Sequence, residues 1–255
     1  MAKRYEFNDQ QWARIAEMLP GKKSDPGRTA KDNRLFVNGV LWVLRSGAQW
    51  DELPERYGKW KSLHKRFTRW ANTGVWERVF AELTSDPRNE YLMLDATLVR
   101  AHQQAATGKV APKGGAEDEA LGRSRGGLTT KIHLLADALG RPLRFLLTGG
   151  QVHESRTAEA MLDGVEGDAV IADKAYDSNA IRAQVEAAGM KAVIPSKLSR
   201  SRRFRHDKAL YRERNRIERC FNKLKHFRRL ATRYDRRACH FLAFLCLAGA
   251  MLWMR

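Results

Sequence analysis

The stretch Leu92-Met93-Leu94-Asp95-Ala96 decides the class of fold, because it has the pattern of a buried strand that ends in one acidic residue, Asp95. Short apolar runs bounded by polar segments are typical of strands in a sheet covered on both faces. The run Val170-Ile171-Ala172-Asp173-Lys174 repeats the arrangement. Moving a carboxylate out of water is costly. Two apolar strands that each end in an acid therefore indicate a functional site.

The segments around these runs alternate between strand and helix patterns beyond residue 90. We predict strands at Tyr91–Val99, Thr130–Ala136, Leu143–Leu147, Ala169–Ala172 and Lys191–Ile194, and helices at Ser155–Leu162, Ser178–Ala188 and from about Asp207. Strands followed by alternating helices and strands indicate an α/β fold, a mixed sheet flanked by helices. Residues 103–127 show no apolar periodicity and are predicted to form a mobile loop.

The first part of the chain has helical periodicity throughout, and Asn8 with Gln11 has the pattern of a capping box at the first helix. A second helix is predicted to end at Gly47. Six of the seven tryptophans lie in the first 76 residues, which favours a small, separate aromatic core. We place the boundary at Thr84 to Asn89, giving a small all-α domain of residues 1–86 and a larger α/β domain of residues 90–255.

This first domain contains a candidate helix-turn-helix. The turn of helix Leu53–Gly58 precedes a basic helix, Lys59–Trp70, which would enter the major groove of DNA. The predicted DNA contacts on it are Lys61, Lys65, Arg66 and Arg69. The alternative is a solvated basic helix in an ordinary helical bundle.

The charge balance favours a polyanionic partner, because the 255 residues carry a formal net charge of +18. Double-stranded DNA is the first candidate. The start of the chain lacks the apolar core of a signal peptide, and the apolar stretch Phe241–Met254 is too short to span a membrane and is predicted to be a buried helix. The three cysteines form no CxxC pair. A cytoplasmic protein without a membrane partner is expected.

The two acids point to metal chemistry if their strands lie in one sheet, because both carboxylates would then reach a common edge. Mg²⁺ prefers oxygen ligands from carboxylates and substrate phosphate. The alternative is that Asp95 caps a turn or pairs with an arginine. Asp177 is the nearest rival acid, and we interpret it as a helix N-cap. No histidine has the paired spacing of a metal ligand.

The helix predicted from Asp207 carries a polar face. At about 100° per residue, Arg214, Glu218 and Lys225 lie within roughly 60° of Tyr211. An apolar stripe lies beside them, so the helix can pack on the sheet with Glu218 at the rim of a cleft. The alternative is a solvated charged face whose alignment is incidental.

Tyr211, Arg214, Glu218 and Lys225 resemble the Y-(2)-R-(3)-E-(6)-K signature of insertion-sequence transposases, and the tracts around Asp95, Lys131 and Asp173 are similar to the short members of insertion sequence family five, within the family-four-like DDE group. The resemblance covers nearly the whole chain. It implies a ribonuclease-H-like catalytic domain without a large insertion domain, because only a short segment separates Asp173 from Glu218.

The resemblance also implies the roles of individual residues. Asp95, Asp173 and Glu218 would be the catalytic metal ligands and hold two Mg²⁺ ions, with Mn²⁺ as a substitute. The implied DNA contacts are Tyr211, Arg214, Lys225, Lys131 and Lys174. Lys174 departs from several relatives, which have arginine after the second acid, and this leaves open the detail of a phosphate contact.

The function implied is that of a transposase that binds the terminal inverted repeats of its insertion sequence, cleaves the DNA ends and joins the 3′-OH to target DNA. Two symmetric ends favour a homodimer in the DNA complex. The alternatives are a sequence-specific DNA-binding regulator without catalysis, an inactivated transposase kept for binding, and a related nuclease that cuts without joining strands.

Overall fold

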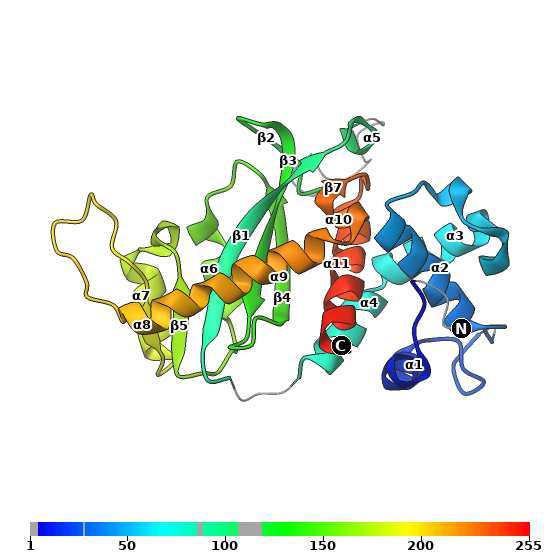
Figure 1. Ribbon diagram of the computed structural model, residues 1–255, viewed down its shortest axis with the longest axis horizontal. Coiled ribbons are helices and arrows are strands. Elements are labelled where there is room, and N and C mark those ends of the chain that lie inside the picture. The colour runs from blue at the N-terminus through cyan, green and yellow to red at the C-terminus, as the bar shows by residue number, and fades with distance from the viewer. Residues whose placement is uncertain (1–4, 28, 86–88, 107–118) are drawn as a thin grey trace.

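The computed structural model describes residues 5–27, 29–85, 89–106 and 119–255, and it contains one mixed sheet flanked by helices (Figure 1). The strands are β1 (Leu92–Ala101), β2 (Gly122–Ser124), β3 (Gly127–Ala136), β4 (Pro142–Gly149), β5 (Ala169–Ala172), β6 (Lys191–Val193) and β7 (Thr232–Arg233). The predicted α/β architecture is confirmed.

The sheet combines an antiparallel half with a parallel half. Strand β3 pairs antiparallel with β1, β2 and β4, whereas β1, β5 and β6 run parallel to one another and β7 adds to the far end of β1. The central position of β1 gives it neighbours on both sides. The tight turn between β3 and β4 forms at Gly140, where φ is 74°.

Helices cover both faces of the sheet, and the alternation of side chains along β1 divides its residues between them. Leu92 and Leu94 pack on the face covered by α6 (Ala158–Leu162) and α7 (Asn179–Ala187). Met93 packs on the face covered by α9 (Asn215–Lys225) and α11 (Ala238–Trp253). Because successive residues alternate, Asp95 and Thr97 share the face of Met93 and lie opposite α9.

The N-terminal part consists of α1 (Asp9–Ile15), α2 (Asn33–Ser46), α3 (Trp60–Asn72) and α4 (Val75–Leu83). The predicted capping box is present, since the Asn8 side chain accepts a hydrogen bond from the Gln11 amide and the Gln11 side chain accepts one from the Asn8 amide. Gly47 ends α2 in the left-handed conformation, with φ of 74°. Both signals act as the sequence predicts.

The predicted separate aromatic core of the N-terminal part is wrong. Helix α11, from the far end of the chain, packs against α3 and α4, and the rings of Phe67 and Phe244 stack with centroids 4.5 Å apart. One continuous apolar cluster therefore joins the N-terminal helices to a face of the sheet. In Figure 1, α11 stands between these two parts. Trp50 also stacks on Phe244 of α11, with ring centroids 6.2 Å apart, although the two residues lie 244 − 50 = 194 positions apart in the sequence.

Helix α11 is the buried terminal helix that the sequence predicts at Phe241–Met254. Of the described segments, none forms a helix long and apolar enough to cross a membrane.

Two further expectations need correction. The predicted loop of residues 103–127 contains α5 (Gln103–Ala106) and strand β2, which is held by pairing with β3; residues 107–118 lie outside the described part. The helix from Asp207 is not one uniform helix. It consists of α8 (Lys208–Tyr211), a 3₁₀ turn (Arg212–Arg214) and α9, and a short α10 (Arg228–Ala231) follows.

Candidate active site

Asp95 and Asp173 are neighbours at the point where β5 ends beside β1: Asp173 follows the last residue of β5, whereas Asp95 lies within β1, which continues to Ala101. The register of β1 and β5 pairs Leu94 with Ala172, so the next residue on each strand is an acid. Asp95 accepts a hydrogen bond of 2.8 Å from the Ala96 amide. Asp173 accepts one of 2.7 Å from the Ala175 amide and so caps the 3₁₀ turn Lys174–Tyr176. The predicted meeting of the two acids is present, but the prediction that Asp95 ends its strand is wrong, because β1 continues beyond it in its pairing with β3.

Arg214 connects this pair of acids to Glu218. Its Nη2 lies 2.7 Å from Oδ2 of Asp95, and its Nη1 lies 2.6 Å from Oε1 of Glu218. The side chain of Glu218 is 54% exposed, whereas that of Asp95 is 9% exposed. The acids of β1 and α9 therefore reach one cation from opposite sides. The alternative expectation that Asp95 pairs with an arginine also holds.

The electrostatics of Asp95 show how crowded with negative charge this edge is. The pKa of Asp95 is raised to about 6, mainly by burial and also by the neighbouring carboxylates of Asp173 and Glu154. Arg214 and the Ala96 amide act in the opposite direction, since both favour the carboxylate. An acid that gains protons this readily is one whose charged form needs a nearby cation.

The other two signature residues lie beside this group. Lys225 donates a hydrogen bond of 3.0 Å from Nζ to Oγ1 of Thr97, two residues beyond Asp95 on β1. Burial raises the pKa of the half-buried Tyr211, and the charge of Arg214 opposes that shift. The predicted polar face of the helix thus meets β1, despite the 3₁₀ turn within it.

Lys131 lies in a different environment from the one expected of a DNA contact. Its side chain is only 10% exposed; Nζ donates to the carbonyl of Val152 across 2.7 Å and lies 3.4 Å from the carboxylate of Glu154. Lys131 pairs with Glu154 and is largely shielded from solvent, and its implied contact with DNA stays a prediction. Lys174, directly after Asp173, is exposed.

Glu154 and Tyr176 are two residues of the site that the sequence analysis misses. Burial raises the pKa of Tyr176 far above its ordinary value, and the charges of Glu154, Asp95 and Asp173 add to the shift. The Tyr176 hydroxyl is buried and has no hydrogen-bond partner among the described residues. Glu154 lies in a 3₁₀ turn after β4, without the apolar run that marks the other acids. The available signal for Tyr176 was its place three residues after Asp173.

Asp177 is not the helix N-cap that the sequence predicts. Ser178 caps α7 by accepting a hydrogen bond of 3.2 Å from the Ile181 amide. The carboxylate of Asp177 is buried and forms ion pairs with Arg182, at 2.9 Å, and Arg200, at 2.7 Å. Asp177 therefore pairs with Arg182 of α7, five residues away, and with Arg200, 23 residues away, instead of capping the helix.

The donor set fits a hard divalent cation, because three carboxylates supply only oxygen ligands. In this arrangement Arg214 provides the positive charge between Asp95 and Glu218, so its guanidinium stands in for a cation. Within the described ranges, no three His, Cys, Asp or Glu side chains converge closely enough to hold a metal. Metal coordination by all three acids therefore requires Arg214 to release at least one of them.

The basic helix α3 presents only part of its predicted DNA face. Lys61, Lys65 and Arg69 are exposed along one side of it. Arg66 differs, because its guanidinium packs over the rings of Phe36, at 4.3 Å, and Trp70, at 4.6 Å, and it donates to the side chain of Asn33. Arg66 is therefore less exposed than the other three residues, and its contact with DNA stays a prediction. The residues before α3 form the 3₁₀ turns Trp50–Glu52 and Glu55–Tyr57.

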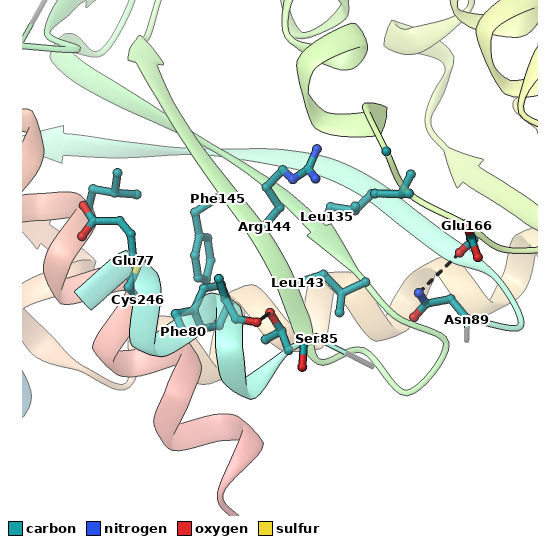
Figure 2. A pocket seen from close by; sticks show the side chains of 15 residues that line it. Glu77, Phe80, Ser85, Asn89, Leu135, Leu143, Arg144, Phe145, Glu166 and Cys246 are labelled. Carbon is teal, nitrogen blue, oxygen red and sulfur yellow. Dashed lines mark hydrogen bonds between the residues drawn. The ribbon is translucent and has the colours of Figure 1, made fainter. Parts of the chain in front are cut away.

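A cavity of about 480 Å³ lies elsewhere, between α4, β4 and α11 (Figure 2). Phe80 and Phe145 stack in its wall with ring centroids 5.2 Å apart, and Asn89 donates across 3.4 Å to the carbonyl of Glu166 at its rim. None of Asp95, Asp173 and Glu218 lines it. The chemistry of the site is therefore assigned to the sheet edge and not to this cavity.

Comparison with known proteins agrees with the geometry. The family described as "Transposase DDE domain" matches residues 87–253, and a family of IS4/5 transposases matches residues 7–80. A transposase for the insertion sequence element IS6501 of Brucella ovis is 41% identical over 131 residues, which are 50% of this chain and 100% of that protein. One for IS402 of Burkholderia cepacia is 34% identical over 135 residues, 48% of this chain and 62% of that one.

Among solved structures, the piggyBac transposase in a synaptic complex with hairpin DNA superposes with a TM-score of 0.53 at 12% sequence identity, covering 94% of this chain and 69% of that one. This likeness supports the ribonuclease-H-like fold. The chain belongs to the DDE-domain transposases of the bacterial IS4/5 insertion sequences, whose activity is DNA transposition.

Proposed function

We propose that this transposase binds the terminal inverted repeats of its own insertion sequence, hydrolyses the DNA at each end and joins the freed 3′-OH to target DNA. The observation that carries the proposal is the adjacency of Asp95, within β1, and Asp173, at the end of β5, with Glu218 linked to Asp95 through Arg214. Three acids of this kind at one sheet edge are not needed by a DNA-binding regulator.

Asp95, Asp173 and Glu218 are the residues that would hold two Mg²⁺ ions, or Mn²⁺ in their place. Such a pair supplies charge neutralisation at the phosphate and stabilises both the attacking and the leaving oxygen. They are the three acids that the family resemblance marks as metal ligands. Burial raises the pKa of Asp95, so positive charge beside it would favour its charged form.

The reaction has two steps that use the same residues. In the first, a water oxygen bonds to phosphorus while the bond to the 3′ oxygen breaks, leaving a 3′-OH and a 5′-phosphate. In the second, that 3′-OH bonds to a target phosphate and displaces the 3′ oxygen of the target strand. Arg214 and Lys225 would bind flanking phosphates, because charge-assisted hydrogen bonds to phosphate are strong. Tyr211 would hydrogen-bond or stack beside them, and Lys174 would contact a phosphate next to Asp173.

End recognition is assigned to the N-terminal part, residues 1–86. Lys61, Lys65 and Arg69 on α3 are exposed and available to DNA. Their contacts with phosphate would make binding steeply dependent on salt. Because each of the two ends needs its own site, the active complex is proposed to be a homodimer on DNA.

The test is cleavage of a labelled duplex that carries the element's own end, in Mg²⁺, with Asp95→Asn, Asp173→Asn and Glu218→Gln beside the wild type. The wild type is expected to cut, and each variant to bind the duplex without cutting it. Cleavage retained by Asp173→Asn contradicts the assignment. A wild type that binds the end and never cuts in Mg²⁺ or Mn²⁺ favours a regulator instead.

A further inference from the structure

The loop between β6 and α8 concentrates positive charge at one end of the molecule. Residues 197–208 contain six Lys or Arg and one acid. Arg202, Arg203 and Arg205 are exposed, and none of the three forms an ion pair within the part of the chain that the structure describes. Figure 1 shows the loop projecting beyond α7 and α8. Three guanidinium groups therefore face solvent together.

The first end of this loop, near Lys197, is fixed by a buried acid, Asp177. Oδ2 of Asp177 accepts hydrogen bonds from the Lys197 amide, at 2.8 Å, and from Nε of Arg200, at 2.7 Å. Its Oδ1 accepts one from Nε of Arg182 across 2.9 Å. Asp177 follows Asp173 by four residues. The position of the loop is thus linked to the strand end that carries the second acid.

The other end of the loop is fixed by contacts of Phe204. The Ser196 hydroxyl accepts a hydrogen bond of 2.8 Å from the Phe204 amide and donates one of 3.4 Å to its carbonyl. The guanidinium groups of Arg182 and Arg200 lie over the Phe204 ring, 4.4 and 4.9 Å from its centroid. After this closure the chain continues to His206, whose ring contacts that of Tyr211 at 5.4 Å.

Arg200 of the loop and Arg182 of α7 therefore support the loop, and Arg202, Arg203 and Arg205 remain exposed. A plain connection between β6 and α8 does not need a buried carboxylate with two arginine partners. Exposed guanidinium groups on a loop whose two ends are fixed suit the phosphates of duplex DNA, which arginine binds with paired hydrogen bonds. One end of the loop is bonded to Asp177, four residues after Asp173. The other end leads to His206, whose ring contacts that of Tyr211.

We propose that Arg202, Arg203 and Arg205 bind the sugar–phosphate backbone of the duplex whose phosphodiester lies at Asp95 and Asp173. This surface is separate from α3 and from the acidic signature. It rests on the proposed function, because it takes the substrate to be DNA. The contact would hold the DNA without reading its sequence, since phosphates carry no base identity.

The test compares two triple variants of the full chain that differ only in charge. Arg202→Gln/Arg203→Gln/Arg205→Gln removes the positive charges, and Arg202→Lys/Arg203→Lys/Arg205→Lys keeps them. Affinity for the end duplex is measured by fluorescence anisotropy over a series of salt concentrations, and thermal unfolding confirms that both variants fold. Each lost phosphate contact lowers the slope of log affinity against log salt by about 0.9.

The glutamine variant is expected to lose about 2.7 from that slope, and the lysine variant is expected to stay close to wild type. An unchanged slope in the glutamine variant overturns the proposal. An equal loss in both variants also overturns it, because it shows that the arginines support the loop and do not act through charge. Cleavage by the wild type is measured in parallel, so a failure of the proposed function is seen separately, as binding without cutting.

Discussion

Arg214 and Asp95 form an ion pair of 2.7 Å between residues 119 positions apart in the chain. This contact fixes the start of α9 against β1 just beyond its pairing with β5, and places another guanidinium nitrogen on Glu218. The acids of the site are thereby kept close without a metal. The arrangement makes Arg214 a competitor of the metal as well as a support for its ligands.

The first prediction concerns Arg214→Gln. Without metal, this variant is expected to be less stable by about 3 kcal/mol, because the buried Asp95 loses its charged partner. Mg²⁺ is expected to raise its melting temperature more than that of the wild type, since the cation then restores the lost charge. Thermal unfolding with and without Mg²⁺ measures both effects.

The matched control is Arg219→Gln, which removes an exposed arginine from the same helix. It is expected to melt as the wild type does and to respond equally to Mg²⁺. An Mg²⁺ shift that is the same for Arg214→Gln and wild type would show that the guanidinium does not occupy the place of a cation.

The second prediction is a pH dependence. The pKa of Asp95 is raised to about 6, and a carboxyl group must lose its proton to bind metal. As pH falls below this value, cleavage at limiting Mg²⁺ is expected to fall by on the order of tenfold per pH unit. Excess Mg²⁺ competes with the proton and is expected to move the midpoint to lower pH. A midpoint that does not move with Mg²⁺ concentration contradicts the linkage.

The third prediction separates the four basic residues of α3. Lys61→Gln/Lys65→Gln/Arg69→Gln is expected to weaken binding to the element's end and to reduce its salt dependence, with little change in stability, because all three side chains are exposed. Arg66→Gln is expected to lower the melting temperature, since its side chain packs on Phe36 and Trp70. End binding unchanged in the triple variant would remove α3 from the recognition surface.

The fourth prediction tests the continuity of the core. Phe67→Ala is expected to cost about 3–5 kcal/mol, because Phe67 is fully buried against Phe244 of α11. Urea unfolding followed by tryptophan fluorescence and by circular dichroism is expected to give coincident transitions. Two separate transitions would mean that the N-terminal helices keep a core of their own.

Local signals in the sequence predict much of this structure. The capping box at Asn8 and the stop at Gly47 depend on neighbouring residues, and both appear as expected. The strand-end position of Asp173 follows from the apolar run before it, whereas β1 continues beyond Asp95 because its later residues pair with β3. What local patterns do not contain is which distant partner a side chain meets. Asp177 is not the predicted cap because its carboxylate forms ion pairs with Arg182 and with the more distant Arg200.

The same limit explains the other differences at the site. Arg66 and Lys131 have the positive charge expected of DNA contacts, but the exposure of their side chains depends on packing between elements. Glu154 lies near the other acids because of the position of the 3₁₀ turn after β4, and no apolar run in the sequence marks that turn. The buried hydroxyl of Tyr176 becomes visible only once the faces of the sheet are assembled.

The most direct test of the account is a single reaction that detects both cutting and joining. A duplex carrying the element's end is incubated with a circular target plasmid and Mg²⁺, with wild type and Glu218→Gln in parallel, and both free 3′ ends and end–plasmid products are measured. The account predicts that the wild type produces both and that Glu218→Gln binds the end and produces neither. Joined products from Glu218→Gln, or cut ends that the wild type never joins, would contradict it.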